Sequence, residues 1–124
     1  MQPTNLTIPK DRKSLKIAFE DDQAYEFSAE ILRVLSPSAE VRGHSPDQRK
    51  TVGGKKNIEI MKVEPVGNYA VRITFDDMHD TGIYSWSFFR KLGETHDDQW
   101  ANYLKELEEK GLSREPAALN GGAS

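Results

Sequence analysis

The acidic turn from Asp76 to Asp80 carries the side chains best suited to chemistry. Its sequence, Asp-Asp-Met-His-Asp, places three carboxylates and an imidazole within five residues. Carboxylate oxygens and imidazole nitrogens bind divalent cations such as iron, manganese and zinc, so His79 with Asp77 and Asp80 is a candidate metal site. The spacing matches no defined metal motif, and aspartates in a turn commonly bond nearby backbone N–H groups instead. A weak metal site and an ordinary hairpin turn both remain open.

His44 is a further candidate ligand. It follows Arg42 and Gly43 in a loop, and it could reach His79 if the fold packs the Ser36–His44 segment against the acidic turn. A loop histidine more often bonds solvent or backbone, which is the alternative for His44. The chain contains no cysteine, and this excludes disulfides, thiolate zinc sites, Fe–S ligation and thiol nucleophiles. No Ser-His-Asp or paired-carboxylate motif is recognisable, so we do not expect an enzyme.

Basic residues gather in the segment from Arg42 to Lys56. This segment contains two adjacent glycines and a single acidic residue, Asp47, and its five cations are Arg42, Arg49, Lys50, Lys55 and Lys56. Backbone N–H groups at glycines can approach an anion, so binding of phosphate or nucleic acid is one hypothesis. No aromatic residues alternate with these cations to stack bases, and a solvated loop is the simpler interpretation. Nucleic acid is therefore not the favoured partner.

The overall composition indicates one folded domain. The 124 residues carry a net charge of −3 and are 36% hydrophobic, which suffices for a core without covalent crosslinks. We expect a flexible N-terminus over residues 1–13, the folded domain over 14–111 and a disordered tail over 112–124. The N-terminus lacks the basic and apolar regions of a signal peptide, and no apolar run is long enough to span a membrane. We therefore expect a cytoplasmic protein without membrane contact.

Hydrophobic periodicity predicts a hairpin and a short helix near the N-terminus. Residues 15, 17 and 19 are apolar and alternate with polar neighbours, as do residues 25 and 27, which is typical of two paired strands. Ser28 is a suitable N-cap for a helix that ends near Ser36, because Pro37 disfavours helical geometry in the residue before it. The segment that follows is expected to be a loop with a short strand near residues 40–42.

The second half of the chain predicts further strands and two helices. A strand with a change of phase, which suggests a β-bulge, covers residues 58–63, and the next strand runs over residues 69–75 with its odd-numbered residues in the core. Ser85 and Thr95 are suitable N-caps for two C-terminal helices, the first of which is expected to end at Gly93. This grouping of elements predicts an α+β fold with an antiparallel sheet and a short helix after the first hairpin.

Three blocks of sequence carry a family resemblance. They are Ile31–Arg33 with Ser36–His44, Ile58–Ile60 with Val63–Gly67, and the hairpin core Gly67–Trp86, which reads GNYAVRITFDDMHDTGIYSW. Jointly these blocks resemble the N-terminal domain of the γ-butyrobetaine hydroxylase-like family, over the span from Ser14 to Leu107. The resemblance implies the fold of that domain.

The resemblance also implies where a metal would lie. In the carnitine-pathway hydroxylases of this family the domain binds zinc through three cysteines and a histidine, and His79 stands at the histidine position. Ser36, Ser38 and Val41 stand where the cysteines would lie, and a hydroxyl is a far poorer zinc ligand than a thiolate. We therefore expect no zinc and no resident cofactor, and weak iron binding through His79 stays open as the alternative. The iron and 2-oxoglutarate ligands of the oxygenase belong to a separate domain, so no hydroxylase activity is implied.

The favoured hypothesis is a non-catalytic interaction module. Related domains are fused to P-loop Fe–S cluster carriers, so the resemblance suggests a partner protein that handles iron or Fe–S clusters. Phe88 lies off the inward stripe of the first C-terminal helix and is expected to be exposed. The predicted partner surface consists of Ser36, Ser38, Glu40, Arg42, His44, His79, Asp80 and Phe88.

Overall fold

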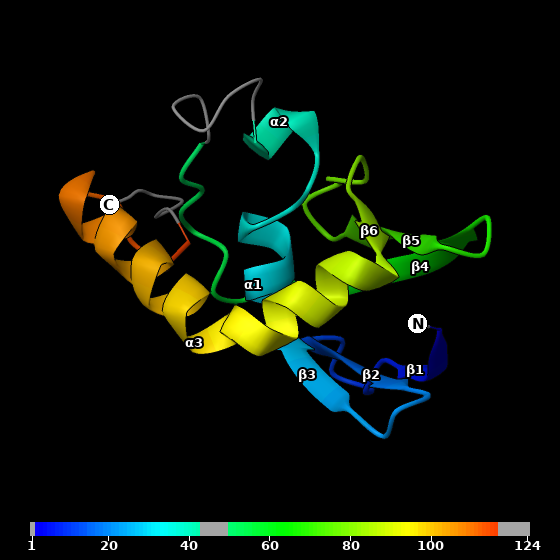
Figure 1. The fold of residues 1–124 in the computed structure, drawn as a ribbon. Helices are drawn as coiled ribbons and strands as arrows, with labels where there is room; N and C mark the ends of the chain where they lie inside the picture. The colour runs from blue at the N-terminus through cyan, green and yellow to red at the C-terminus, as the bar shows by residue number, and fades with distance from the viewer. Residues whose placement is uncertain (1, 43–49, 117–124) are drawn as a thin grey trace.

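Two small antiparallel sheets and three helices make up the part of the chain that the computed structural model describes, residues 2–42 and 50–116 (Figure 1). The first sheet has the order β1 (Pro3–Thr7), β2 (Ser14–Phe19), β3 (Ala24–Ser28). The second has the order β4 (Ile60–Val66), β5 (Ala70–Phe75), β6 (Ile83–Ser85). The helices are α1 (Ala29–Val34), α2 (Ala39–Arg42) and α3 (Trp86–Glu109). The predicted α+β class is confirmed.

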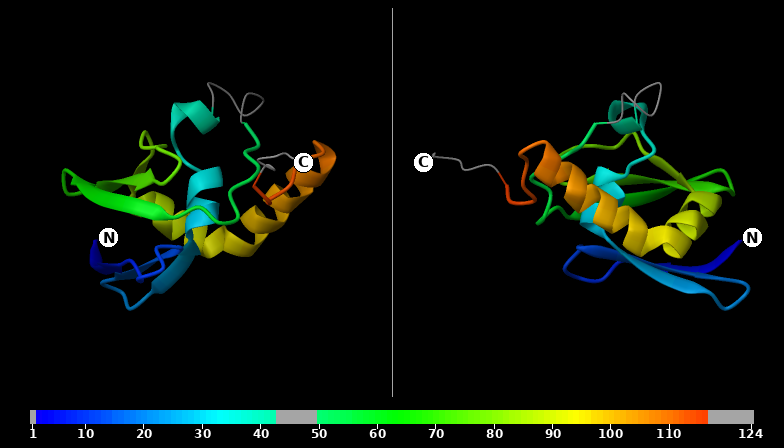
Figure 2. Two further views of the ribbon diagram at one scale, coloured as in Figure 1. Left: turned by 180° about the vertical axis from the view of Figure 1, so that it is seen from behind. Right: turned by 60° about the vertical axis from the view of Figure 1, so that its left-hand side comes forward.

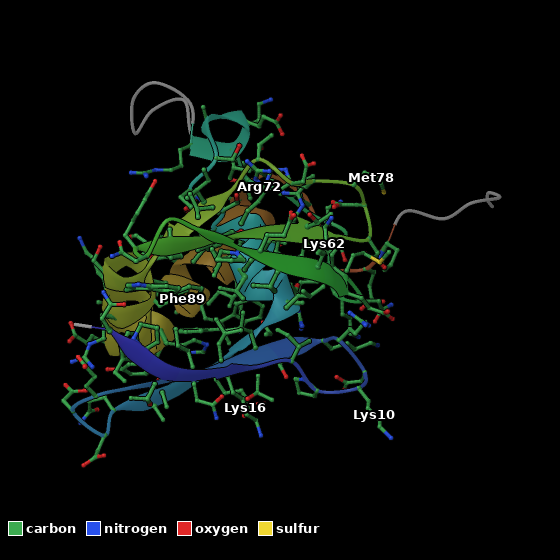
Figure 3. All side chains as sticks on the ribbon, turned by 90° about the vertical axis from the view of Figure 1, so that its right-hand side faces the viewer. Lys10, Lys16, Lys62, Arg72, Met78 and Phe89 are labelled. Carbon is green, nitrogen blue, oxygen red and sulfur yellow. The ribbon has the colours of Figure 1, made fainter. Side chains whose placement is uncertain are left out.

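The main hydrophobic cluster joins both sheets to α1 and α3. Side chains alternate between the two faces of a strand, so β2 and β5 each place every second residue inward. Leu15, Ile17, Ile73 and Phe75 are almost fully buried as a result. Figure 3 shows the two sheets one above the other, with Lys16 on the outer side of the first. Helix α3 contacts both sheets, at β3 and at β6, and Figure 2 shows it running alongside them.

The helix boundaries follow from individual polar residues. The Ser28 hydroxyl accepts the Ile31 N–H and caps α1, as predicted, and Ser85 caps α3 in the same way. The two predicted C-terminal helices are the two halves of α3, which meet at a kink where Thr95 has non-helical geometry. The Thr95 hydroxyl donates to the Lys91 carbonyl instead of capping a second helix.

Gly93 lies inside α3 rather than at the end of a helix, which corrects the predicted boundary. The Tyr25 ring from β3 packs against it so closely that a Cβ at this position would overlap the ring. A glycine is therefore required for this contact between α3 and the first sheet. Beyond the kink, Tyr103 and Leu107 form a second, smaller cluster with Val34 of α1.

Three local predictions are wrong. Residues 3–7, expected in a flexible N-terminus, pair with β2 as strand β1. Residues 40–42, expected to form a short strand, belong to α2. Tyr69, expected on the core face of its strand, lies in the turn before β5 and is 56% exposed. The predicted β-bulge, by contrast, is confirmed by a register shift between Ile60 and Lys62.

Residues 112–116 pack against the domain, although the sequence predicts a disordered tail there. The Gly54 N–H donates to the Ser113 carbonyl, and the Arg114 guanidinium donates two bonds, of 2.7 and 2.9 Å, to Glu30 of α1. Glu30 is 4% exposed, so Arg114 supplies the opposite charge that a buried carboxylate requires. Residues 117–124 lie outside the described part of the chain.

Candidate functional site

A set of polar contacts joins residues 36–42 to residues 76–82, and we call these two segments together the polar junction. Ser36 Oγ lies 3.0 Å from His79 Nε2, and Ser38 Oγ lies 2.6 Å from Thr81 Oγ1. The first segment follows α1 and includes α2, which Figure 1 shows beside the turn between β5 and β6. The family zinc geometry implies that these two segments approach each other in this way.

The polar junction has the connectivity of a Ser-His-acid triad, but its hydroxyl is buried. His79 Nδ1 lies 3.3 Å from Glu40 Oε1, while Nε2 faces the Ser36 hydroxyl. Ser36 is 0% exposed, and Gly82 lies so close that a Cβ there would collide with Ser36 Oγ. The same oxygen accepts the Ser38 N–H. Ser36 has no exposed surface, and its hydroxyl orders the chain through these two contacts.

Asp77 is held by two cations rather than by the imidazole beside it. Its Oδ2 accepts Arg33 Nε at 2.8 Å and Lys55 Nζ at 2.7 Å, and its Oδ1 accepts the backbone N–H of His79. Partial burial raises the pKa of the Asp77 carboxyl, but the bonds from Lys55, the His79 N–H and Arg33 outweigh this and lower the pKa to about 2. Lys55 of the basic segment is thus engaged inside the protein.

His79 is buried beside a positive charge. Burial first, and then the Arg33 guanidinium, hold the pKa of the His79 imidazole below its usual value of 6.5, against the opposing charge of Glu40. A neutral ring protonated at Nδ1 faces Glu40 with that nitrogen and accepts the Ser36 hydroxyl at Nε2. Arg33 Nη1 is buried without a hydrogen-bond partner among the described residues. The polar junction therefore accommodates the neutral form of the imidazole.

The predicted metal ligands His79, Asp77 and Asp80 are not brought together as a ligand set. Asp77 is bonded to cations, and Asp80 is exposed. Within residues 2–42 and 50–116, no group of three or more His, Asp or Glu side chains is arranged to hold a metal ion. His44 lies outside the described residues, so the structure does not place it.

The residues at the family zinc positions do not fit zinc either. Ser36 uses its hydroxyl on the histidine nitrogen Nε2, and Ser38 uses its hydroxyl on Thr81. Val41 is buried and has no donor atom in its side chain. Hydrogen bonds between side chains therefore hold together the segments that the thiolates and the histidine would join through zinc.

Burial divides the predicted partner surface. Ser36, Ser38 and His79 are buried, Phe88 is half-buried, and the exposed members are Glu40, Arg42 and Asp80. The exposed members can meet a partner directly, whereas the buried ones can act only by positioning them. No helix of the described residues is both long and apolar enough to cross a membrane.

A groove along α3 is the feature that the sequence reasoning missed. It has a volume of about 470 Å³ and lies between α3, the end of α1 and α2. Its apolar lining comes from Leu35, Val41, Phe88 and Leu92, and Arg42 lies at its rim. The α3 residues that face it recur every three or four positions, and this spacing is the signal that could have predicted a shared face.

Comparison with known proteins assigns the chain to a family of domains. The model of the gamma-butyrobetaine hydroxylase-like N-terminal family matches residues 6–90. The chain therefore belongs to the gamma-butyrobetaine hydroxylase-like N-terminal family. A comparison with curated proteins gives no match.

Solved structures agree with this assignment. Two NMR solution structures are similar to the chain at 39% and 43% identity, with TM-scores of 0.80 and 0.79. Each match covers 98% of this chain, and 95% and 90% of the respective structure. A crystal structure of a protein with unknown function from Acidithiobacillus ferrooxidans ATCC 23270, in the DUF971 family, is 30% identical with a TM-score of 0.62. That match covers 74% of this chain and 92% of the other.

Proposed function

We propose that this domain is a non-catalytic interaction module that binds a partner protein along the groove beside α3. The observation that carries the proposal is the groove itself, with Arg42 at its rim and Phe88 at its apolar end. Both residues belong to the partner surface predicted from the sequence. A partly apolar cleft with a few convergent polar groups is the usual form of a binding site.

The polar junction supports the proposal because it fixes one wall of the groove. Ser36 and Ser38 tie the connection between α1 and α2 to the β5–β6 turn, and the Glu40 N–H donates to Ser38 Oγ at 3.1 Å. Helix α2, with Val41 and Arg42, is thereby held opposite α3. The groups that could perform chemistry are used for positioning.

The class of partner follows from the family resemblance rather than from the groove. Related domains are fused to Fe–S cluster carriers, so proteins that handle iron or Fe–S clusters are the first candidates. Two of the five cations of the basic segment are engaged within the chain, Lys55 with Asp77 and Lys56 with Glu115, and this weakens the case for nucleic acid.

Site-specific photocrosslinking in the full chain tests the proposal. A photoreactive residue at position 42, on the groove rim, is expected to crosslink one partner protein in native cells, which mass spectrometry identifies. The same residue at position 16, on the outer side of the first sheet, is the matched control and is expected to give no such product. Absence of a crosslinked protein at position 42, or an equal yield at both positions, would contradict the proposal.

A further inference from the structure

We infer that the groove binds an extended peptide segment in which an apolar side chain lies next to a carboxylate. The inference rests on the proposed function, since it names the part of the partner that the interaction module would hold. Four features of the groove carry it: the stripe of α3 residues, the apolar end, the two cations and the two side-chain amides.

One continuous face of α3 lines the groove. Phe88, Leu92, Thr95, Gln99, Asn102 and Glu106 are separated by alternating steps of four and three residues, which places them on one side of a helix. The stripe changes from apolar to polar along the chain. Its length is about 27 Å at the usual rise of a helix, which an extended segment of about eight residues matches.

The apolar end of the stripe can seat one large side chain. Leu92 and Val41 are buried, and Leu35 and Phe88 are half-buried. The accessible apolar surface of this end therefore comes mainly from Leu35 and Phe88. Phe88 packs edge-on against Tyr84 and Phe89, which fixes its ring. A preformed apolar surface of this kind loses little side-chain entropy when it is covered.

Two cations stand beside this apolar end. Arg42 and Lys91 are exposed, and neither side chain has a hydrogen-bond or ion-pair partner among the described residues. Glu106 lies at the opposite end of the stripe and accepts a bond from Thr51. The two cations attract a carboxylate to the apolar end of the groove.

The polar half of the stripe favours an extended backbone over a helix. Gln99 and Asn102 each carry an amide with donors and an acceptor, and neither side chain has a hydrogen-bond partner within residues 2–42 and 50–116. An extended peptide presents free N–H and C=O groups to such amides. A helical peptide has already satisfied those groups internally, so the amides would gain nothing from it.

A selection from displayed random peptides of eight residues tests the inference on the full-length protein. The expected result is enrichment of peptides with a large apolar residue next to Asp or Glu. A selected peptide, made synthetically and labelled with fluorescein, is then measured by fluorescence anisotropy. Lys91→Glu is expected to weaken its binding about three- to tenfold, because a weak attraction becomes a repulsion.

Matched variants separate the groove from the rest of α3. Lys105→Glu makes the same charge change at an exposed position of α3 that does not line the groove, and it is expected to leave the affinity unchanged. Gln99→Ala is expected to weaken binding about two- to tenfold, in line with the loss of one hydrogen bond. Both groove positions are at least partly exposed, and unchanged unfolding curves are the check that each variant is folded.

The possible outcomes distinguish this inference from the proposed function. Enrichment of basic or purely apolar peptides, or equal effects of the two lysine variants, would overturn the acidic peptide. A partner that crosslinks at position 42 but is insensitive to Lys91→Glu and Gln99→Ala would also overturn it, while leaving the interaction module intact. Failure to crosslink any partner would instead remove the proposed function.

Discussion

The main hydrophobic cluster and the polar junction hold the same domain together in different ways. The cluster is formed by alternating apolar residues of β2 and β5 with contributions from α1 and α3. The polar junction depends on a few hydroxyl, imidazole and carboxylate contacts between segments more than 30 residues apart, such as Ser36 and His79. The first is stabilised by area removed from water, and the second by directional bonds to the buried residues Ser36, Ser38 and His79.

The cluster is therefore expected to determine the stability of the fold, and the polar junction to determine the position of α2. Loss of an apolar residue from the cluster is expected to weaken the whole fold, whereas loss of a polar contact is expected to weaken it less and to release α2 from its place beside the groove.

The largest expected effect is in the cluster. Ile73 is 0% exposed at the centre of β5, so Ile73→Ala should lower the free energy of unfolding by about 2–5 kcal/mol. Met61, which is 53% exposed on the neighbouring strand, is the control, and Met61→Ala should change it by less than about 0.5 kcal/mol. Urea unfolding measures both. Equal effects at the two positions would show that the core face of β5 has been assigned wrongly.

The polar junction should respond more weakly. Ser36→Ala removes the partner of His79 Nε2 and of the Ser38 N–H, both buried, and should lower the free energy of unfolding by about 1–3 kcal/mol. Ser87→Ala removes an exposed hydroxyl whose one hydrogen bond among the described residues is to Ser85, and it should change the free energy of unfolding by less than about 0.5 kcal/mol. If Ser36→Ala behaves like this control, the polar junction contributes nothing to stability.

The protonation of His79 gives a smaller, pH-dependent effect. Its folded-state pKa is lowered below 6.5, so at lower pH the unfolded chain binds a proton that the folded chain resists. The free energy of unfolding is therefore unaffected by this protonation above pH 6.5, and it declines as the pH falls below 6.5. Urea unfolding at pH 7.5 and pH 5.5 should show this decline in the wild type and less of it in His79→Gln. The pKa of Asp77 is about 2, so the stabilisation that its carboxylate provides is lost only at a pH below the 5.5–7.5 range of this experiment.

Chelation should have no effect on either region. The three positions occupied by thiolates in zinc-binding relatives hold Ser36, Ser38 and Val41, so hydrogen bonds rather than a metal maintain the polar junction. Elemental analysis of the purified protein should find no stoichiometric zinc, and the melting temperature should be unchanged in EDTA. About one zinc per chain, lost together with the folded structure, is the result that refutes this prediction.

The sequence predicted the main hydrophobic cluster well because strand alternation and helix capping depend on residues close together in the chain. The alternation of residues 15–19 and 71–75 depends only on strand geometry, and the Ser28 cap lies within three residues of the N–H it accepts. The family resemblance, rather than any periodicity, predicted that Ser36 and Ser38 would approach His79.

The remaining features depend on contacts between distant residues. Strand β1 has few apolar residues and exists by pairing with β2, while residues 112–116 are held by the bond between Arg114 and Glu30, 84 positions apart. The groove needs α1, α2 and α3 in place before its lining can be recognised. No window of the sequence contains these partners together.

The kink at Thr95 divides α3 into two halves that pack differently. Phe89 and Leu92, before the kink, belong to the main cluster, and Tyr103 and Leu107, after it, belong to the smaller cluster, while Trp100 packs against both. Amide hydrogen exchange along α3 should therefore fall into two groups, with the C-terminal half opening at lower free energy than the sheets. Because the groove stripe crosses the kink, such opening would remove its polar half while the apolar end stays in place.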